Sequence, residues 1–320
     1  MILTPPQTIA LLASLTLLPL LVGCGRVAPE VADALSPQPT PLAFTAHHAT
    51  NALLRVDALV KHHTPRDAGT PAGAQAAGWL QEQLQSIGVE AEVVRFEDET
   101  PRGRKTFANV IGTHRGRSDG WIVLLSHFDT KSGIGPTFQG ANDSGSSTGL
   151  LLELASIIKN SGERHYNFLF GFMDGEECQL AYSDRDGFHG SKHFARALKK
   201  EGRNLKAVIL TDMIGDRDLK INVPRNSSKE LKLLALKAAA TAGHRDKISI
   251  LSSTIYDDHQ AFLDLNFPAI VLIDFEFGSR PGSNDYWHTL EDSMDKLSAE
   301  SLLTTGQIVV EMINMLCGNF

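Results

Sequence analysis

The stretch FLFGFMDGEE, residues 168–177, begins as an apolar and aromatic run and ends on three carboxylates within four residues. A short apolar run without alternating polar residues is typical of a strand that is buried on both faces of a sheet. Carboxylates that directly follow such a strand are costly to bury and repel one another. A positively charged partner is therefore expected beside Asp174, Glu176 and Glu177.

Similar buried-strand patterns occur elsewhere in the chain, and helical patterns separate them. The apolar runs WIVLLSHFD, LKAVILTDMIG and PAIVLIDF occupy residues 121–129, 205–215 and 268–275. Two more strands are expected at residues 89–96 and 107–114. Apolar residues recur at helical spacing in residues 51–62, 72–88, 145–160, 190–200, 227–243, 257–265 and 298–316. This alternation predicts an α/β fold with a doubly wound, mostly parallel central sheet flanked by helices.

Length and composition favour one large globular domain and argue against a nucleic-acid partner. The chain has 320 residues, of which 42% are hydrophobic, and that length is enough for a sizeable core. The net charge of −7 is the opposite of what a basic nucleic-acid-binding face requires. With only three cysteines no disulfide framework is indicated, so the fold must depend on its core.

The first residues have the pattern of a secretion signal. An apolar run from Ile9 to Val22 is shorter than the roughly 20 residues of a membrane span, which favours a signal peptide over residues 1–23. Leu21-Val22-Gly23-Cys24 resembles the bacterial lipobox, which implies a lipid on Cys24. An ordinary secretory signal and a retained membrane anchor are the alternatives.

The segment after Cys24 is expected to connect this lipid to the folded part of the chain. Residues 24–45 are rich in Pro and Ala and show little periodicity, which is typical of a flexible tether. The folded domain is then predicted to span residues 46–320. A lipid anchor would place the protein in the cell envelope of a bacterium, at a membrane, facing the periplasm or the cell surface.

Chemically active side chains follow the predicted strands at the points where the strands end. Because ligands bind at the carboxyl ends of the strands in such sheets, these side chains are expected to lie close together. They belong to His127, Asp143, Glu176, Glu177, Asp212 and His288. Imidazole nitrogens and carboxylate oxygens are suitable ligands for Zn²⁺. The pattern therefore predicts a zinc site at this edge of the sheet.

Each of these residues also has an ordinary structural interpretation. His127 could be a core histidine, Asp143 could cap the following helix, and Asp212 could be a turn residue. His288 could lie on the surface, and the two glutamates could be solvated loop charges. The zinc site disappears only if all of these interpretations hold together.

The segments around these residues resemble a known clan of enzymes. SHFD, GANDSGSSTGLLLELA, DGEE, DMIGD and WHT are similar to segments of the M28-type zinc aminopeptidases, and the resemblance covers most of the chain from about residue 50. Within that clan, three stretches resemble the glutaminyl cyclases, also called glutaminyl-peptide cyclotransferases. These stretches are YSDRDGFHGSKHFA, which begins at Tyr182, YDDHQAFLDLNFPAIVLI, which begins at Tyr256, and Trp287-His288-Thr289.

The resemblance implies an acyltransferase that converts the N-terminal glutamine of peptides or proteins to pyroglutamate and releases ammonia. It implies one zinc ion per chain, which acts as a Lewis acid and is held by Asp143, Glu177 and His288. Glu176 would be the general acid and base, because it lies beside the metal without binding it. A monomer is expected.

The resemblance also assigns roles around the metal. Asp212 and Asp257 match acidic residues that form hydrogen bonds near the reacting nitrogens, and Trp287 matches a wall of the substrate pocket. Tyr182 stands where the animal enzymes carry Trp. Tyr182 is therefore a candidate substrate-binding residue in a pocket whose shape differs from theirs.

Two other functions are compatible with the sequence. A two-zinc aminopeptidase would use His127 and Asp212 for a second metal, with Asp143 bridging the two ions, and would hydrolyse the N-terminal peptide bond. A lipid-anchored binding protein with a degenerate site would have lost Glu176 or a metal ligand, yet all of them are present. Metal content and the products formed from Gln- and Leu-terminal peptides distinguish the two enzymes.

Overall fold

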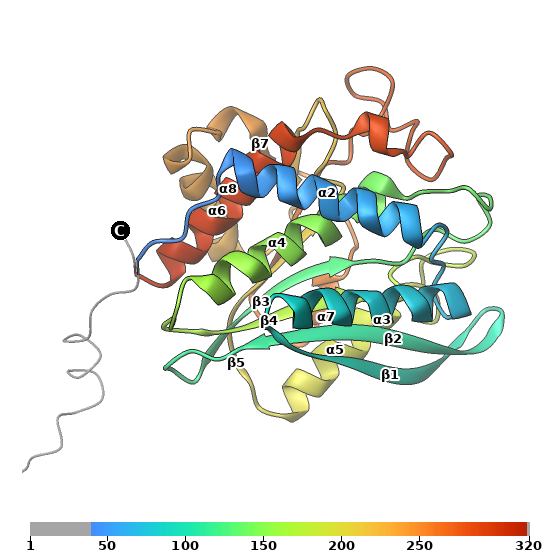
Figure 1. Cartoon of the computed structure of the whole chain (residues 1–320), viewed down its shortest axis with the longest axis horizontal. Coiled ribbons are helices and arrows are strands. Elements are labelled where there is room, and N and C mark those ends of the chain that lie inside the picture. The colour runs from blue at the N-terminus through green and yellow to red at the C-terminus, as the bar shows by residue number, and fades with distance from the viewer. Residues whose placement is uncertain (1–39, 319–320) are drawn as a thin grey trace, which may run out of the picture. The chain divides into compact units, whose positions relative to one another are not determined.

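The computed structural model describes residues 40–318, and their central feature is an eight-stranded sheet with helices on both faces (Figure 1). The strands are β1 (Glu90–Thr100), β2 (Gly103–His114), β3 (Gly120–His127), β4 (Asn167–Met173), β5 (Asn204–Asp212), β6 (Ile221–Val223), β7 (Ile248–Ile250) and β8 (Ala269–Ile273). The helices are α2 (Ala46–His62), α3 (Pro71–Ser86), α4 (Ser147–Asn160), α5 (His189–Lys200), α6 (Lys229–Thr241), α7 (His259–Leu263) and α8 (Ala299–Leu316). The predicted α/β class is confirmed.

The strands run in the order β1-β2-β4-β3-β5-β8-β6-β7 across the sheet. The four central strands, β4, β3, β5 and β8, are parallel to one another. Antiparallel pairing joins β1 to β2, β2 to β4, and β6 to β8. The sheet is therefore parallel at its centre, as predicted, and β3, β4 and β5 all end at the same edge.

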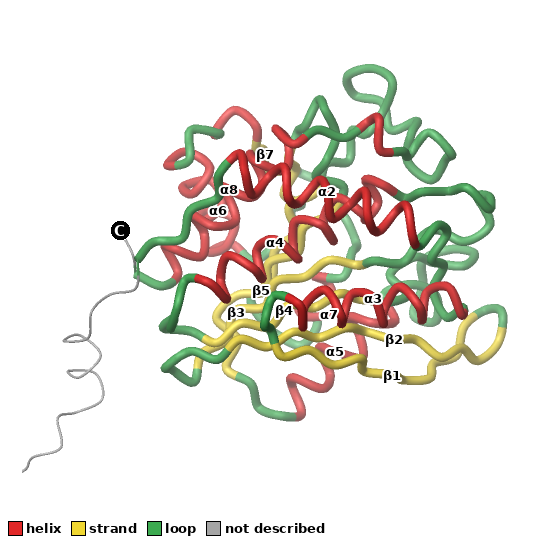
Figure 2. The backbone as a smooth tube through the Cα atoms, in the orientation of Figure 1, coloured by secondary structure: helices red, strands yellow, loops and turns green. Residues whose placement is uncertain are grey.

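The fully apolar central strands serve two separate cores, one on each face of the sheet. In β3, Ile122 and Leu124 pack in a cluster with side chains of α2, α3, α4, α6 and α8. Val123 and Leu125 of the same strand point the other way and pack with α5 and α7. Successive strand side chains point to opposite faces, so a strand covered on both sides has no polar alternation. Figure 2 shows α2, α3 and α4 of the first group in front of the strands.

The segment before α2 belongs to the folded domain, which corrects the predicted tether boundary at residue 45. Leu42 and Phe44 are buried in the core, and the Leu42 backbone N–H donates a hydrogen bond of 2.8 Å to Asn314 of α8. Gly306 makes room for this packing, because a Cβ there would lie 2.5 Å from the Phe44 ring. The predicted signal peptide, Cys24 and most of the tether lie outside the described residues.

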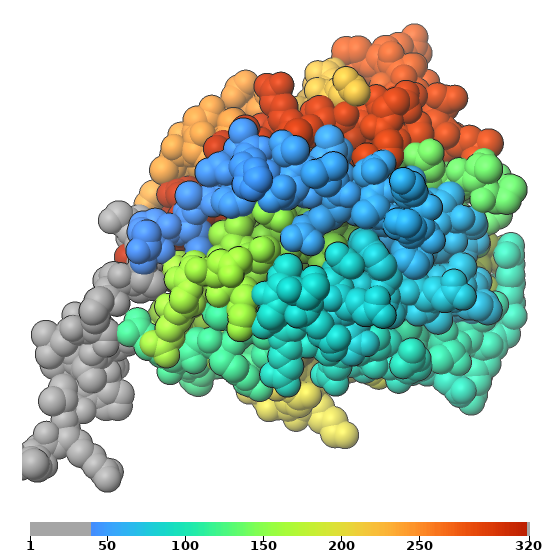
Figure 3. Space-filling model, in the orientation of Figure 1, coloured from blue at the N-terminus to red at the C-terminus, as the bar shows by residue number. Residues whose placement is uncertain are grey.

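Helices α2, α3 and α4 lie together on one face of the molecule (Figure 3). Within residues 40–318, no helix combines the length and the apolar character that crossing a membrane would require.

The three-residue strands β6 and β7 extend the sheet beyond β8 and were not expected from the sequence, because so few residues show no periodicity.

Candidate active site

Three predicted zinc ligands converge at the edge of the sheet where the parallel strands end. Asp143 lies in the irregular segment Ala141–Ser146 that leads into α4, Glu177 follows β4, and His288 lies in the long loop after β8. The His288 Nε2 atom is 2.9 Å from Glu177 Oε1 and 3.3 Å from Asp143 Oδ2. Ligand atoms about 2.0–2.1 Å from a tetrahedral zinc lie about 3.3 Å apart. The three side chains therefore fit one zinc ion.

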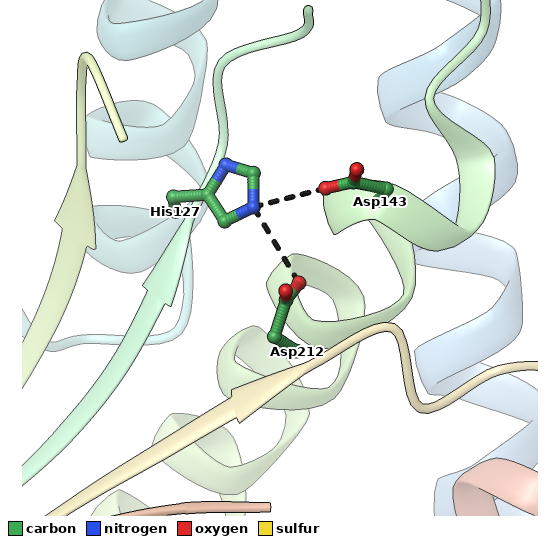
Figure 4. A group of neighbouring side chains, drawn as sticks. All are labelled: His127, Asp143 and Asp212. Atoms are coloured by element: carbon green, nitrogen blue, oxygen red, sulfur yellow. Dashed lines mark ion pairs between the residues drawn. The ribbon is translucent and has the colours of Figure 1, made fainter. Parts of the chain in front are cut away.

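His127, Asp143 and Asp212 form a second group of possible ligands (Figure 4). This group shares Asp143 with the first. The His127 Nε2 atom is 3.1 Å from Asp143 Oδ1 and 3.4 Å from Asp212 Oδ1. All three residues are buried, and neither ring nitrogen of His127 has a partner with hydrogen-bond geometry within the described part of the chain. Buried polar atoms without partners are rare in proteins. The second group therefore has the chemistry and the spacing to bind another cation. Small side-chain movements could instead form hydrogen bonds between His127 and its two acidic neighbours.

The electrostatics of the two groups favour a cation. Burial alone would lower the pKa of His288, but its hydrogen bonds with Asp143 and Glu177 outweigh burial and raise it to about 9. Burial also opposes a charged His127, yet its acidic neighbours raise its pKa well above the usual value. Burial would raise the pKa of Asp143, but the two histidines hold it far below its usual range. A positive charge is therefore stabilised at this position whatever carries it.

Glu176 lies beside the metal ligands and faces a pocket of about 330 Å³. Burial raises the pKa of its carboxyl well above the usual range, and the Glu177 and Asp257 carboxylates add to that effect against the opposing charge of His127. A carboxyl with a raised pKa can both take up and release a proton near neutral pH. Glu176 therefore has the setting of a general acid and base.

The pocket beside Glu176 brings together the other predicted residues. It is lined by Asp143, Glu176, Tyr182, Asp212, Met213, Thr254, Ile255, Tyr256, Asp257, Ile273, Phe275 and Trp287. The Trp287 indole lies 3.9 Å from the His288 ring and 5.3 Å from the Phe275 ring, measured between centroids. Burial raises the pKa of Asp257 well above its usual value, and the nearby Asp212 and Asp258 carboxylates raise it further. The pocket is thus lined by both aromatic and acidic side chains.

Asp129 binds the backbone of the two glutamates. Its Oδ1 and Oδ2 atoms accept hydrogen bonds of 3.2 Å from the N–H groups of Glu176 and Glu177, respectively. Asp129 is fully buried. Asp174, the third carboxylate of the DGEE stretch, accepts a hydrogen bond of 2.7 Å from the Ala108 N–H and therefore has a structural role.

Lys131 is a site residue that the sequence analysis missed. Its Nζ atom is 3.5 Å from Glu177 Oε2 and donates a hydrogen bond of 2.6 Å to the Cys178 carbonyl. Burial would lower the pKa of this lysine, but the Glu177 carboxylate and the Cys178 contact raise it on balance. The available signal was its position four residues after His127, just beyond the end of a predicted strand. Cys178 itself is buried.

The sequence matches a known protein family and a named relative. The sequence profile of peptidase family M28 matches residues 109–313. The glutaminyl-peptide cyclotransferase of Drosophila melanogaster is 27% identical over 264 residues, which cover 74% of this chain and 73% of that protein.

Two solved structures are also similar to the whole folded domain. The crystal structure of an Acidobacteriales bacterium glutaminyl cyclase has a TM-score of 0.82 and 31% sequence identity, and the match covers 92% of this chain and 100% of that chain. The glutaminyl cyclase of Porphyromonas gingivalis has a TM-score of 0.76 and 26% identity, over 85% of this chain and 98% of that chain.

Proposed function

This chain belongs to peptidase family M28 and, within it, to the glutaminyl cyclases, and we propose that it converts the N-terminal glutamine of peptides or proteins to pyroglutamate. The observation that carries the proposal is the placement of Glu176. Its carboxyl faces the pocket next to Asp143, Glu177 and His288 but belongs to neither group of possible metal ligands among the described residues. A proton-transfer residue is thus separate from the metal ligands.

We propose that Asp143, Glu177 and His288 hold one zinc ion. When bound, this zinc supplies Lewis-acid polarisation of the glutamine γ-carboxamide carbonyl. The three side chains offer two carboxylate oxygens and one imidazole nitrogen, which leaves the fourth position of a tetrahedral ion open for substrate. Lys131 lies beside Glu177 and offsets part of the negative charge of this ligand set.

The reaction needs one bond to form and one to break within a single substrate molecule. The α-amino nitrogen attacks the γ-carboxamide carbon, a five-membered lactam forms, and the bond to the amide nitrogen breaks to release ammonia. Glu176 takes a proton from the attacking amine and returns it to the leaving nitrogen. Because the reacting groups belong to one residue, the main task of Asp212, Asp257 and Trp287 is to orient that residue in the pocket.

The rival function, a two-zinc aminopeptidase, is favoured by one observation. His127, Asp143 and Asp212 form a second group of possible ligands that shares Asp143 with the first. Two ions in these groups would activate a water molecule for peptide-bond hydrolysis. The relatives reported above are named as a glutaminyl-peptide cyclotransferase and as glutaminyl cyclases, which supports cyclisation over hydrolysis.

Paired peptides test the proposal directly. The protein is incubated with two peptides that differ only in an N-terminal Gln or Leu, and mass spectrometry follows each of them. We expect the Gln peptide to lose ammonia and keep its full length, and the Leu peptide to stay intact. A released amino acid from the Leu peptide, together with two zinc ions per chain in atomic absorption, would establish the aminopeptidase instead.

We also propose that the protein is anchored in the bacterial envelope through a lipid on Cys24 and acts as a monomer. The lipobox-like sequence and the Pro-rich segment that follows it support the lipid anchor. Cys24→Ala should move the protein from the detergent phase to the aqueous phase in Triton X-114 partitioning. An unchanged distribution would contradict the anchor, and light scattering of the soluble variant measures its mass.

A further inference from the structure

The hydroxyl of Tyr182 touches both glutamates of the site. Its Oη atom donates to Glu176 Oε2 at 3.2 Å and lies 3.3 Å from Glu177 Oε2. Among the side chains of residues 40–318, it is the only hydrogen-bond donor found on the Glu176 carboxylate. One O–H group therefore lies between the proposed proton-transfer residue and a proposed metal ligand.

The loop that carries Tyr182 is closed by its own hydrogen bonds. The Asp186 carboxylate accepts hydrogen bonds from the backbone N–H groups of Gln179, Leu180 and Ala181, at 2.6, 2.8 and 3.0 Å. The backbones of Ser183 and Asp186 also bond to each other in both directions. Because three backbone N–H groups donate to one buried carboxylate, the backbone of residues 179–186 has little conformational freedom. The position of Tyr182 is therefore fixed by its own loop.

The ring of Tyr182 is fixed as well. It stacks on Phe188 at a centroid distance of 4.8 Å and an interplanar angle of 16°. Gly187 lies against the ring, and a Cβ at that position would come within 2.6 Å of it. Gly187 also has a φ of +89°, which favours glycine. The sequence Asp186-Gly187-Phe188 thus serves to place one phenol.

We propose that Tyr182 is a positioning residue whose hydroxyl holds the Glu176 carboxylate toward the substrate and steadies Glu177 at the metal. The inference rests on the proposed function, because it assigns Glu176 the proton transfer. Two adjacent buried carboxylates repel each other. The hydroxyl between them is the side-chain donor that Glu176 would otherwise lack among residues 40–318, and it gives Glu177 a further donor beside the His288 ring. An aromatic side chain without this hydroxyl fills the same space but leaves Glu176 free to change rotamer.

The substitution Tyr182→Phe tests the proposal, with Tyr286→Phe as the matched control. Tyr286 packs on Phe277 and does not line the pocket. For Tyr182→Phe we expect kcat on an N-terminal Gln peptide to fall about 10- to 100-fold while KM changes less than about threefold. We also expect zinc to be lost to a chelator at about tenfold lower chelator concentration, because Glu177 loses a partner. Tyr286→Phe should match the wild type in each measurement.

The possible outcomes separate this inference from the proposed function. Wild-type kcat and zinc affinity in Tyr182→Phe would overturn the inference, and so would a change in KM alone, which would make Tyr182 a pocket wall. Thermal unfolding checks that both variants are folded. If the wild type forms no pyroglutamate, the proposed function fails. The zinc affinity still tests the inference in that case, because an unchanged affinity in Tyr182→Phe would show that the hydroxyl does not hold Glu177 at the metal.

Discussion

The Asp292 carboxylate accepts a hydrogen bond of 3.1 Å from the backbone N–H of Asp143, a proposed metal ligand. The other oxygen of Asp292 accepts a hydrogen bond of 2.7 Å from the N–H of Asn142. Asp129 binds the amides of the two glutamates in the same way. Two segments of the site, the one that carries Asp143 and the one that carries the two glutamates, are thus each held through their backbone by a fully buried carboxylate.

The substitution Asp292→Asn should weaken zinc binding without removing any ligand. An asparagine has one acceptor oxygen, so its amino group would face one of the two backbone N–H groups and displace the segment that carries Asp143. Outer partners of metal ligands typically contribute about 10- to 100-fold to metal affinity. We expect a loss of that size in competition with a zinc chelator. Asp246→Asn, at an exposed position, is the control, and equal affinities in the two variants would contradict the role of Asp292.

Glu176→Gln and Glu177→Gln should separate proton transfer from metal binding, although the residues are neighbours. Glu176→Gln removes the proposed acid and base, so kcat should fall about 10²- to 10⁴-fold while the zinc content stays at the wild-type level. Glu177→Gln removes a charged ligand, and its zinc affinity should fall by more than about 100-fold. Atomic absorption and pyroglutamate formation are measured on the same preparations. Loss of zinc in Glu176→Gln would reverse the two assignments.

The fold was largely predictable because the central strands have an extreme composition. Strands such as β3 and β4 are buried on both faces, so almost every residue is apolar and the strand is visible without an alignment. The β6 and β7 strands have three residues each and depend on their neighbour β8 for their conformation. Leu42 and Phe44 were assigned to the tether because isolated apolar residues show no periodicity, and only their contacts reveal that they are buried.

The sequence allowed the prediction of site residues whose own side chains have metal-binding chemistry and follow a predicted strand. Asp143, Glu177 and His288 are of this kind, and the structure brings them together. Residues that act on the backbone were not predictable, because nothing in the type or spacing of Asp129 or Asp292 shows which amides they will bind. Lys131 and the hydroxyl of Tyr182 act through side-chain contacts that exist only in the folded chain.

Arg66 is expected to be essential for stability. It is a fully buried arginine whose side chain, among residues 40–318, donates hydrogen bonds only to backbone carbonyl oxygens. Its guanidinium donates to the carbonyls of Phe128, Gln139 and Gly140, the last two at 2.7 and 2.8 Å. A lysine cannot reproduce this planar arrangement, and each buried carbonyl left without a donor costs about 1–3 kcal/mol. Arg66→Lys should therefore lower the free energy of unfolding by about 2–4 kcal/mol in urea denaturation.

The matched control for this substitution is Arg280→Lys, because Arg280 is exposed in the loop after β8. Its free energy of unfolding should stay within about 0.5 kcal/mol of the wild type. A similarly small change in Arg66→Lys would show that the carbonyl contacts contribute little to stability.

His259 gives the fold a specific sensitivity to acid. Its side chain is fully buried at the start of α7, and its Nε2 atom lies 3.2 Å from the Asn226 amide nitrogen, so Nε2 acts as the acceptor. Burial lowers the pKa of His259 to about 3. In the unfolded chain a histidine has a pKa of about 6.5. Below that pH the unfolded state binds a proton that the folded state cannot, so stability is lost as the pH falls from 6.5 toward 3.

His259→Gln should remove this sensitivity, because a glutamine can accept the same hydrogen bond and does not titrate. From pH 6 to pH 4, the free energy of unfolding of the wild type should fall by about 2–3 kcal/mol more than that of the variant, at about 1.4 kcal/mol per pH unit. Urea denaturation of both proteins, freed of zinc with a chelator, measures the difference while the other acid-sensitive groups cancel. A difference that stays constant over this range would mean that His259 is protonated in the folded protein.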